Sequence, residues 1–184
     1  ENGSPDIHMD IFSVEPTDER NYYTLVTSGV GDHRMNVPKE LAEYKLERAE
    51  IVVYLPADWN ISDHEEKNYW PLRWLKILAR LPLEEDSWLG WGHSVPNGKP
   101  FAENTQLSSV LLINPENVEE GAAVCQLPNG EEVNFYQMIP LYEEEVNFKI
   151  QNGAETLLGK MGEISAVVDI HRLNVCEGFG RPKE

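Results

Sequence analysis

The first third of the chain carries the alternation of apolar and polar positions that is typical of β-strands. Residues 6–14 place isoleucine and methionine at every second position, which is the period of a half-buried strand. Residues 22–27 and 49–55 are rich in aromatic and β-branched residues and predict two further strands. Turn residues separate the three segments, so we expect them to form an antiparallel meander.

An amphipathic helix is the next element that the pattern predicts. Ser62 and Glu65 stand at the spacing of a capping box, and Pro71 suits the first turn of a helix. Pro82 predicts the end of that helix, because proline removes a hydrogen bond from a helix interior. The apolar arc is broad, which indicates packing on more than one side; it comprises Leu72, Trp74, Leu75, Ile77, Leu78, Ala79 and Leu81.

The second half of the chain again shows strands followed by helices. Asn129 and Gly130 lie between two apolar runs and predict a hairpin, because a type I′ turn needs positive φ at both positions. The expected strands cover residues 88–93, 106–113, 124–127, 132–139 and 166–170. Helices are expected at residues 143–151 and 154–161, and three glutamates suit the positive end of the first helix dipole.

The arrangement of these elements indicates a single domain. No internal repeat and no long polar linker divides residues 1–184, and both halves contribute strands. We therefore expect one domain of the α/β (α+β) class, with one sheet and helices packed against it. Residues 1–5 and 178–184 are expected to be loose ends.

Charge narrows the classes of partner. Thirty-two acidic and 15 basic residues give a formal net charge of −17, which repels nucleic acid and anionic membranes and attracts basic proteins. Acidity also keeps a protein dispersed, so the charge by itself does not require a partner. No apolar run approaches the roughly 20 residues that cross a bilayer. The chain also opens without a secretory signal pattern, so we expect a cytoplasmic protein.

Motifs for cofactors and covalent catalysis are missing from the sequence. It contains no G-x-S-x-G elbow and no phosphate-binding glycine loop, and therefore we expect neither an enzyme nor a bound cofactor. Cys125 and Cys176 lack CxxC spacing and further cysteine partners, which argues against a structural zinc site. We expect two reduced thiols, although the sequence leaves open whether they pair.

One metal site remains as an alternative. His8 and Asp10 share a face of one expected strand, and Asp169 and His171 are spaced in the same way near the other end of the chain. If those two strands were neighbours, the four side chains could hold zinc or iron in a metal-dependent hydrolase. The other interpretation is that both pairs decorate the polar faces of half-buried strands.

A tryptophan and glycine segment at residues 86–93 is the first candidate for a partner-binding surface. Large rings on a glycine-rich backbone can approach another protein closely, and tryptophan is enriched in binding hot spots. The alternative is that Trp88 and Trp91 cover the end of the core, because aromatic residues bury a large area there. The candidate residues are Trp88, Trp91 and His93.

Two further segments are candidates for partner binding. The first is the loop at residues 29–36, which is otherwise a polar connection between strands. The second is the acidic first turn of the helix at residues 143–151, which otherwise only stabilises the helix dipole. The residues concerned are Asp32, His33 and Arg34 in the loop, and Glu143, Glu144 and Glu145 in the helix.

The order of motifs along the chain resembles the suppressor-of-fused family. The similar segments are residues 22–29 with Asp32, 49–56, Trp70 and Pro71, 78–80, Gly92 and His93, 111–113, the Asn129-Gly130 hairpin with Phe135 and Gln137, Glu143 to Glu145, and Asp169 and Ile170. The resemblance implies an α/β fold with a central mixed, mostly antiparallel sheet and flanking helices. It also implies a non-enzymatic protein-binding module.

The chain is most similar to the compact, single-domain bacterial members of that family, which are thought to include immunity proteins. The resemblance therefore suggests a module that neutralises a basic toxin by direct binding; a scaffold or oligomer subunit is a further alternative. Animal members hold their peptide partly with a Tyr and an Asp, and Leu81 and Gly92 stand at those positions here. Only His93 matches, so the peptide binding of the animal proteins does not carry over.

Overall fold

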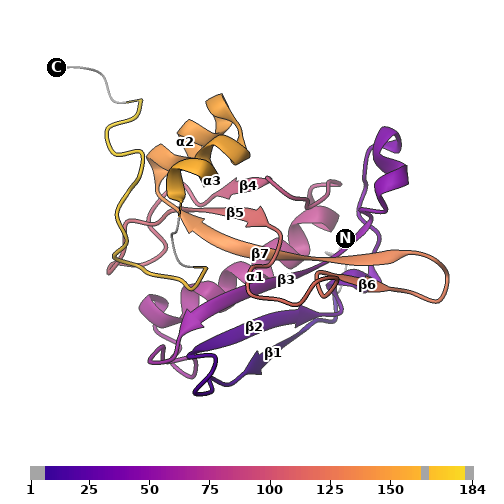
Figure 1. Ribbon diagram of the computed structural model, residues 1–184, viewed down its shortest axis with the longest axis horizontal. Helices are drawn as coiled ribbons and strands as arrows, with labels where there is room; N and C mark the ends of the chain where they lie inside the picture. The colour runs from indigo at the N-terminus through magenta and orange to yellow at the C-terminus, as the bar shows by residue number, and fades with distance from the viewer. Residues whose placement is uncertain (1–6, 163–165, 181–184) are drawn as a thin grey trace, which may run out of the picture.

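The computed structural model describes residues 7–162 and 166–180 and is shown in Figure 1. Its centre is a seven-stranded sheet in the order β1-β2-β3-β7-β5-β4, with β6 paired to β7 beside this path. β3 and β7 are parallel and the other strand pairs are antiparallel, which confirms the expected mixed, mostly antiparallel sheet. The strands are β1 (Asp10–Val14), β2 (Tyr22–Ser28), β3 (Arg48–Pro56), β4 (Ser94–Pro96), β5 (Ser109–Ile113), β6 (Val124–Gln126) and β7 (Glu132–Leu141).

Helices cover both faces of this sheet. The alternation along β5 shows this directly, because Val110 and Leu112 join one apolar cluster whereas Leu111 and Ile113 join another. The first cluster contains α1, and the second contains α2 and α3, which stand together above the sheet in Figure 1. The helices are α1 (Glu66–Glu84), α2 (Glu143–Asn152) and α3 (Ala154–Met161), with short 3₁₀ helices η1 (Val30–Asp32) and η2 (Lys39–Tyr44).

The cluster under α1 is the larger core. Trp70 is fully buried and stacks on Phe101 with ring centroids 4.6 Å apart, and Trp74 meets the same ring edge-on. Burying each large side chain of this kind contributes roughly 1.5–3 kcal/mol before the entropy of ordering is subtracted. The aliphatic residues of the cluster include Leu25, Ile51, Val53, Leu55, Leu75, Leu78, Val110, Leu112 and Met138.

The first expected strand is shorter than the sequence pattern indicates. Residue 6 lies outside the described residues, and β1 begins only at Asp10, which pairs with Ser28 at the end of β2. After Ser28 the chain turns at Gly29, where φ is +104° and a Cβ would stand 2.5 Å from the carbonyl oxygen of His8. Residues 7–9 therefore cross this turn and have no strand to pair with.

The helix at 66–84 also differs from the prediction at both ends. It begins at Glu66, so Ser62 is not its cap and Pro71 lies inside it rather than in its first turn. Pro82 does not end it either, since the helix runs on to Glu84. Each proline removes one backbone donor, but both rings are buried, and their packing offsets that loss.

Two other expected strands are absent from the described chain. Residues 88–93 form a turn in which Gly92 has φ of +78°, and β4 follows at Ser94 instead. Residues 166–170 make a single parallel bridge, between Val167 and Tyr54 of β3. The bridge stays isolated because β7 leaves β3 after the Val52–Gln137 pair, so only the end of β3 is open there.

Candidate partner-binding groove

A groove of about 640 Å³ lies between α2, the segment around β4, and the C-terminal segment at residues 166–180. We call this C-terminal segment the strap. One wall comes from α2 through Glu143, Glu144 and Ile150, and the opposite wall from β4 and the loop after it. The strap contributes Leu173, Asn174 and Glu177. Three regions that are far apart in the sequence therefore build one concave surface.

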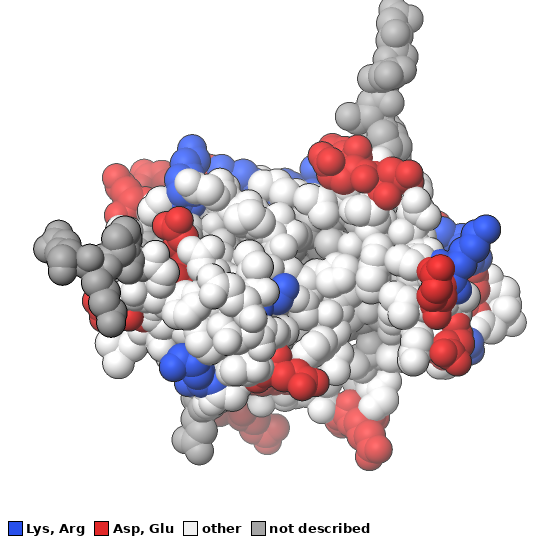
Figure 2. All heavy atoms as spheres, turned by 90° about the horizontal axis from the view of Figure 1, so that it is seen from above, with Lys and Arg blue, Asp and Glu red and all other residues white. Residues whose placement is uncertain are grey.

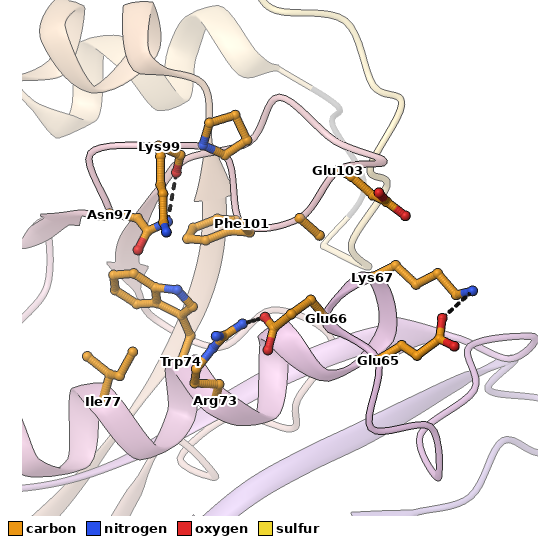
Figure 3. Close-up of a pocket in the computed structure, with 12 residues that line it drawn as sticks. Glu65, Glu66, Lys67, Arg73, Trp74, Ile77, Asn97, Lys99, Phe101 and Glu103 are labelled. Carbon is orange, nitrogen blue, oxygen red and sulfur yellow. Dashed lines mark hydrogen bonds and ion pairs between the residues drawn. The ribbon is translucent and has the colours of Figure 1, made fainter.

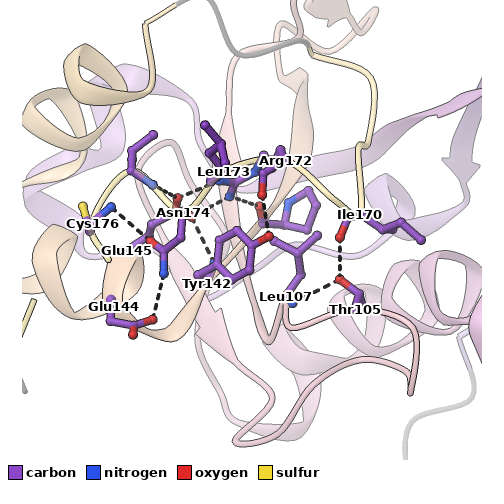
Figure 4. A network of polar contacts seen from close by, with 12 residues as sticks. Thr105, Leu107, Tyr142, Glu144, Glu145, Ile170, Arg172, Leu173, Asn174 and Cys176 are labelled. Atoms are coloured by element: carbon purple, nitrogen blue, oxygen red, sulfur yellow. Dashed lines mark hydrogen bonds and ion pairs between the residues drawn. The ribbon is translucent and has the colours of Figure 1, made fainter. Parts of the chain in front are cut away.

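A buried ion pair fastens the strap to α2, as Figure 4 shows. Arg172 donates two hydrogen bonds to Glu145, Nη1 to Oε1 at 2.6 Å and Nη2 to Oε2 at 2.5 Å. Glu145 is fully buried, and the Arg172 side chain is 7% exposed. Two-point contact between guanidinium and carboxylate sets both position and orientation, so this pair fixes where the strap lies.

The same carboxylate also caps the helix. Glu145 accepts a hydrogen bond from the backbone N–H of Tyr142, which completes a capping box at the start of α2. It accepts another from the N–H of Val175, while the Tyr142 hydroxyl donates to the carbonyl of Arg172 at 2.6 Å. The start of α2 and the strap are thus held by one shared polar network.

The exposed lining of the groove combines acidic and apolar groups. Leu173 is 85% exposed and Ile150 is 70% exposed, and both line the groove. Glu143 and Glu177 are exposed on the same lining, and Glu144 accepts a hydrogen bond from Asn174. A surface of this kind suits a protein segment that carries both an apolar side chain and positive charge.

The backbone beside the groove is also available. β4 pairs with β5 on one side, and no other strand of the described residues pairs with its second side. An open edge of this kind presents unpaired N–H and C=O groups to an extended segment. Pro96 at the end of β4 limits that edge to a short stretch.

A second hollow, of about 670 Å³, lies on the other side of the loop after β4 and is shown in Figure 3. Trp74 and Phe101 form its apolar floor, and Lys99 and Pro100 line both hollows. Ion pairs at its rim join Arg73 to Glu66 and Lys67 to Glu65. These four charges are already paired with one another, so they are less available to a charged partner.

Charge is unevenly distributed over the molecule. Figure 2 views the face on which α2 and α3 stand, and most of its charged residues lie along the margins of a broad uncharged centre. The acidic residues behind the net charge of −17 are therefore not spread evenly over this face. Within residues 7–162 and 166–180, no helix is both long and apolar enough to cross a membrane.

The predicted acidic turn divides into residues with different roles. Glu143 and Glu144 line the groove. Glu145 is fully buried and bound to Arg172, so its carboxylate cannot reach a partner. The strap residues Leu173 and Glu177 were missed by the sequence reasoning, because the C-terminal end showed no periodicity there.

The predicted tryptophan segment lies next to the groove rather than in it. Trp88 packs against the α1 cluster, whereas Trp91 is 41% exposed and lines a separate hollow of about 330 Å³. His93 Nδ1 lies 3.2 Å from the carbonyl oxygen of Trp88, so this nitrogen must carry the proton. Burial lowers the pKa of His93, and the positive charge of Lys149 adds to that effect, while the hydrogen bond to Trp88 opposes it.

The third group of predicted partner-binding residues lies in a loop that is bound to the sheet away from the groove. It consists of Asp32, His33 and Arg34. Arg34 forms ion pairs with Glu131 of the β6–β7 hairpin and with Glu47. The preceding turn is held by the buried Glu50, which accepts hydrogen bonds at 2.9 Å from the N–H groups of Gly29 and Gly31. This loop is not brought together with the other predicted residues.

The residues of the metal alternative do not meet either. Asp10 begins β1, which pairs with β2, and His8 precedes that strand. Asp169 and His171 follow the bridge at Val167, which pairs with β3, so the two segments are not the neighbours that the hypothesis requires. Among the described ranges there is no group of three His, Cys, Asp or Glu side chains that could hold a metal ion.

Comparison with known proteins decides the family. The family model for the suppressor of fused protein (SUFU) matches residues 5–173. The chain belongs to the suppressor of fused family. The uncharacterized protein UU111 of Ureaplasma parvum serovar 3 is 27% identical over 167 residues, which are 90% of this chain and 78% of that protein.

Solved structures of SUFU proteins share the fold. A putative SUFU homologue from Neisseria gonorrhoeae FA 1090 superimposes with a TM-score of 0.65 at 20% identity, covering 91% of this chain and 78% of that one. Drosophila Suppressor of Fused superimposes with a TM-score of 0.62 at 15% identity. The match covers 91% of this chain and 42% of the Drosophila chain. A chain from the Sufu–Fu complex also superimposes with a TM-score of 0.62 at 15% identity, and the match covers 91% of this chain and 76% of that one.

Proposed function

We propose that this SUFU-family chain is a non-enzymatic protein-binding module that captures a basic segment of its partner in the groove. The observation that carries the proposal is the groove itself, where the exposed Leu173 and Ile150 stand among Glu143 and Glu177. A partner would place an apolar side chain against the two aliphatic groups and cations beside the carboxylates. The existence of a Sufu–Fu complex supports protein binding as the activity.

The finer form of the proposal is neutralisation of a toxin. A basic toxin domain would be drawn to the acidic chain by long-range attraction and would then be blocked by the contact itself. An extended segment of such a partner could also pair with the open edge of β4. We place this activity in the cytoplasm, which is supported by Cys125 and Cys176 being free thiols.

A capture experiment with a matched control tests the groove. The tagged chain is mixed with extract of its native host, and the same is done with two triple variants of equal charge change. The groove variant is Glu143→Lys, Glu177→Lys and Leu173→Asp, and the control is Glu19→Lys, Glu84→Lys and Val118→Asp at exposed positions elsewhere.

We expect one protein to be captured by the wild type and the control but not by the groove variant. With the purified pair, the groove variant should weaken Kd at least tenfold, because loss of hot-spot contacts typically costs about 2 kcal/mol or more. In the toxin form, co-expression of the wild-type chain, and not of the groove variant, protects cells that express the partner. Equal capture by both variants, or turnover of a small molecule with no partner, would contradict the proposal.

A second candidate function is that of an oligomer subunit. β1 is an edge strand, and its Phe12 and Val14 are 56% and 48% exposed. Exposed apolar groups on an unpaired edge favour association with another strand. Light scattering over a range of concentrations should then give a mass above one chain, which Phe12→Asp lowers; a single-chain mass throughout would reject this candidate.

A further inference from the structure

The chain contains several asparagines that are followed directly by glycine. Asparagine is chemically labile, and a following glycine has no Cβ to obstruct a reaction between the side chain and the backbone. These pairs stand at residues 2–3, 97–98, 129–130 and 152–153, and the first lies outside the described residues. In the other three pairs the glycine has a positive φ and open space where a Cβ would stand. Sequence and backbone shape therefore do not distinguish these three pairs.

Backbone hydrogen bonds do distinguish them. The N–H of Gly130 donates to the carbonyl of Leu127 at 3.0 Å, and the N–H of Gly153 donates to the carbonyl of Lys149 at 2.7 Å. Within residues 7–162 and 166–180, the N–H of Gly98 donates to no acceptor. A backbone nitrogen becomes a nucleophile only when it loses its proton, and a hydrogen bond to a carbonyl holds that proton in place. Gly98 therefore carries the available nitrogen.

The side chain of Asn97 is directed toward that nitrogen. Its Nδ2 donates a hydrogen bond of 2.7 Å to the carbonyl of Lys99, as Figure 3 shows. Because Gly98 stands between the two bonded residues, this contact directs the side chain along the loop toward Gly98. Gly98 itself is exposed, so water reaches the same place.

The two other side chains are held differently. Asn152 lies at the end of α2, and its Nδ2 donates to the carbonyl of Phe148, which directs the side chain backward and away from Gly153. Asn129 is held at both side-chain atoms, since Oδ1 accepts from the N–H of Glu131 and Nδ2 donates to the carboxylate of the same residue. Both asparagines therefore need local opening before they can react.

We propose that Asn97 is a site of spontaneous deamidation and that the fold makes it the most reactive of the three described pairs. The Gly98 nitrogen loses its proton to hydroxide and forms a bond to Cγ of Asn97. The bond from Cγ to Nδ2 breaks, and Nδ2 takes up a proton and leaves as ammonia. Because the reacting groups belong to one loop, the ring closure needs no second molecule other than water and its ions.

The product of this ring closure is a five-membered succinimide, which water then opens. Addition of water at Cγ breaks the bond from Cγ to the Gly98 nitrogen and gives aspartate. Addition at the backbone carbonyl of residue 97 breaks the other carbon–nitrogen bond and gives isoaspartate, in which the chain runs through Cγ. Both products carry a negative charge that Asn97 lacks.

The change has a consequence that rests on the proposed function. Gly98, Lys99 and Pro100 line the groove. A carboxylate at position 97 cannot donate to the carbonyl of Lys99, so the contact that holds the loop is lost. The new charge stands beside the groove and adds to the attraction of a basic partner by Glu143 and Glu177.

Site-resolved mass spectrometry after incubation of the folded chain at pH 8 tests the deamidation itself. We expect Asn97 to react roughly tenfold faster than Asn129 or Asn152, because only its neighbouring nitrogen is free to attack. Exposure alone predicts the opposite order, since Asn129 and Asn152 are exposed whereas Asn97 is half-buried. In urea the three rates should converge.

Two results would overturn the proposal. One is a rate at Asn129 or Asn152 that equals or exceeds the rate at Asn97 in the folded chain. The other is formation of aspartate alone at position 97, because opening of a succinimide gives isoaspartate as well.

Binding of an octalysine peptide tests the consequence separately. The Asn97→Asp variant should bind the peptide severalfold more tightly than the wild type. The matched control is Asn129→Asp, which makes the same charge change on the β6–β7 hairpin away from α2 (Figure 1) and should bind as the wild type does. Equal affinity of the two variants would overturn the local effect of charge. Absence of binding to all three proteins would contradict the proposed function, while the deamidation rates would stand by themselves.

Discussion

The two faces of the sheet are stabilised in different ways. Under α1, the large side chains Trp70, Leu75 and Leu78 are fully buried and pack directly on the strands. On the other face, α2 and α3 bury a smaller apolar cluster, and the strap is held by the Glu145–Arg172 pair. Apolar packing tolerates small rearrangements, whereas a buried ion pair is stable only while both partners are present.

This difference places the groove on the face where a buried ion pair adds to the apolar contacts of Cys176 and Phe179 in holding the strap. The residues that shape the groove, Leu173 and Asn174 among them, follow directly after Arg172. Loss of the pair should therefore change the groove before it changes the α1 core, because regions of a protein can open independently. The predictions below test this separation.

The largest effect is expected from Glu145→Ala. It leaves Arg172 buried without its carboxylate, removes the helix cap at Tyr142 N, and should lower the free energy of unfolding by about 3–5 kcal/mol. Urea denaturation gives this value, and hydrogen exchange should show the strap opening first. Glu143→Gln, two positions away and exposed, is the control and should change little.

Replacing both Glu145 and Arg172 tests whether the charges of this pair must be kept together. The double variant Glu145→Leu with Arg172→Met removes the two charges together, so it should be clearly more stable than Glu145→Ala. If the double variant were as unstable as the single one, the strap would depend on hydrogen bonds rather than on the compensation of charge.

A somewhat smaller effect is expected in the α1 core. Leu78→Ala creates a cavity between α1 and the sheet and should cost about 2–5 kcal/mol, measured by the same denaturation. Val168 and Ile170 of the strap belong to or pack on the α1 cluster, so the comparison uses residues 172–180, whose hydrogen exchange should stay at the wild-type level under native conditions. Selective opening of the strap in this variant would contradict the separation of the two faces.

The smallest effect concerns pH and the segment beside the groove. Burial, with a contribution from Lys149, lowers the pKa of folded His93 below its ordinary 6.5, so the folded state takes up the proton less readily than the unfolded chain. The stability that neutral His93 provides is therefore fully present above pH 6.5 and is lost as the pH falls through the folded pKa.

Denaturation at pH 7.5 and pH 5.5 checks this prediction. The loss of stability between the two values should be smaller in His93→Gln than in the wild type. His64→Gln, at an exposed position, should behave as the wild type does. An unchanged pH dependence in His93→Gln would show that this ring is not responsible.

The sequence predicted an element correctly where a local signal was not opposed by burial of the same residues. The hairpin at Asn129 and Gly130 and the helix beginning at Glu143 are present, because turn residues and helix-end charges are local signals. The turn is not the predicted type I′, since Gly130 has a positive φ of 84° and Asn129 does not. The boundaries near Pro71 and Pro82 were wrong, because burial of both rings outweighs the local preference of proline to end a helix. The strand expected at 88–93 is also absent from the described residues, because the chain turns at Gly92, where φ is +78°.

Part of the candidate site could be anticipated as well. Glu143 and Glu144 were identified from their acidic run, whereas Glu145 in the same run is internal. Spacing could not distinguish them, because only the third glutamate points at Arg172, which lies 27 residues further along. Leu173 carried no signal, since an apolar residue near a chain end is ordinary.

By itself, the sequence determined the class of fold, the family and the acidity that narrows the choice of partner. Those properties depend on composition, on short periodicities and on the order of motifs. Only the tertiary structure decided which acidic groups line the groove and which one is buried against Arg172. Burial and pairing are set by segments that are distant in sequence and meet only after the chain has folded.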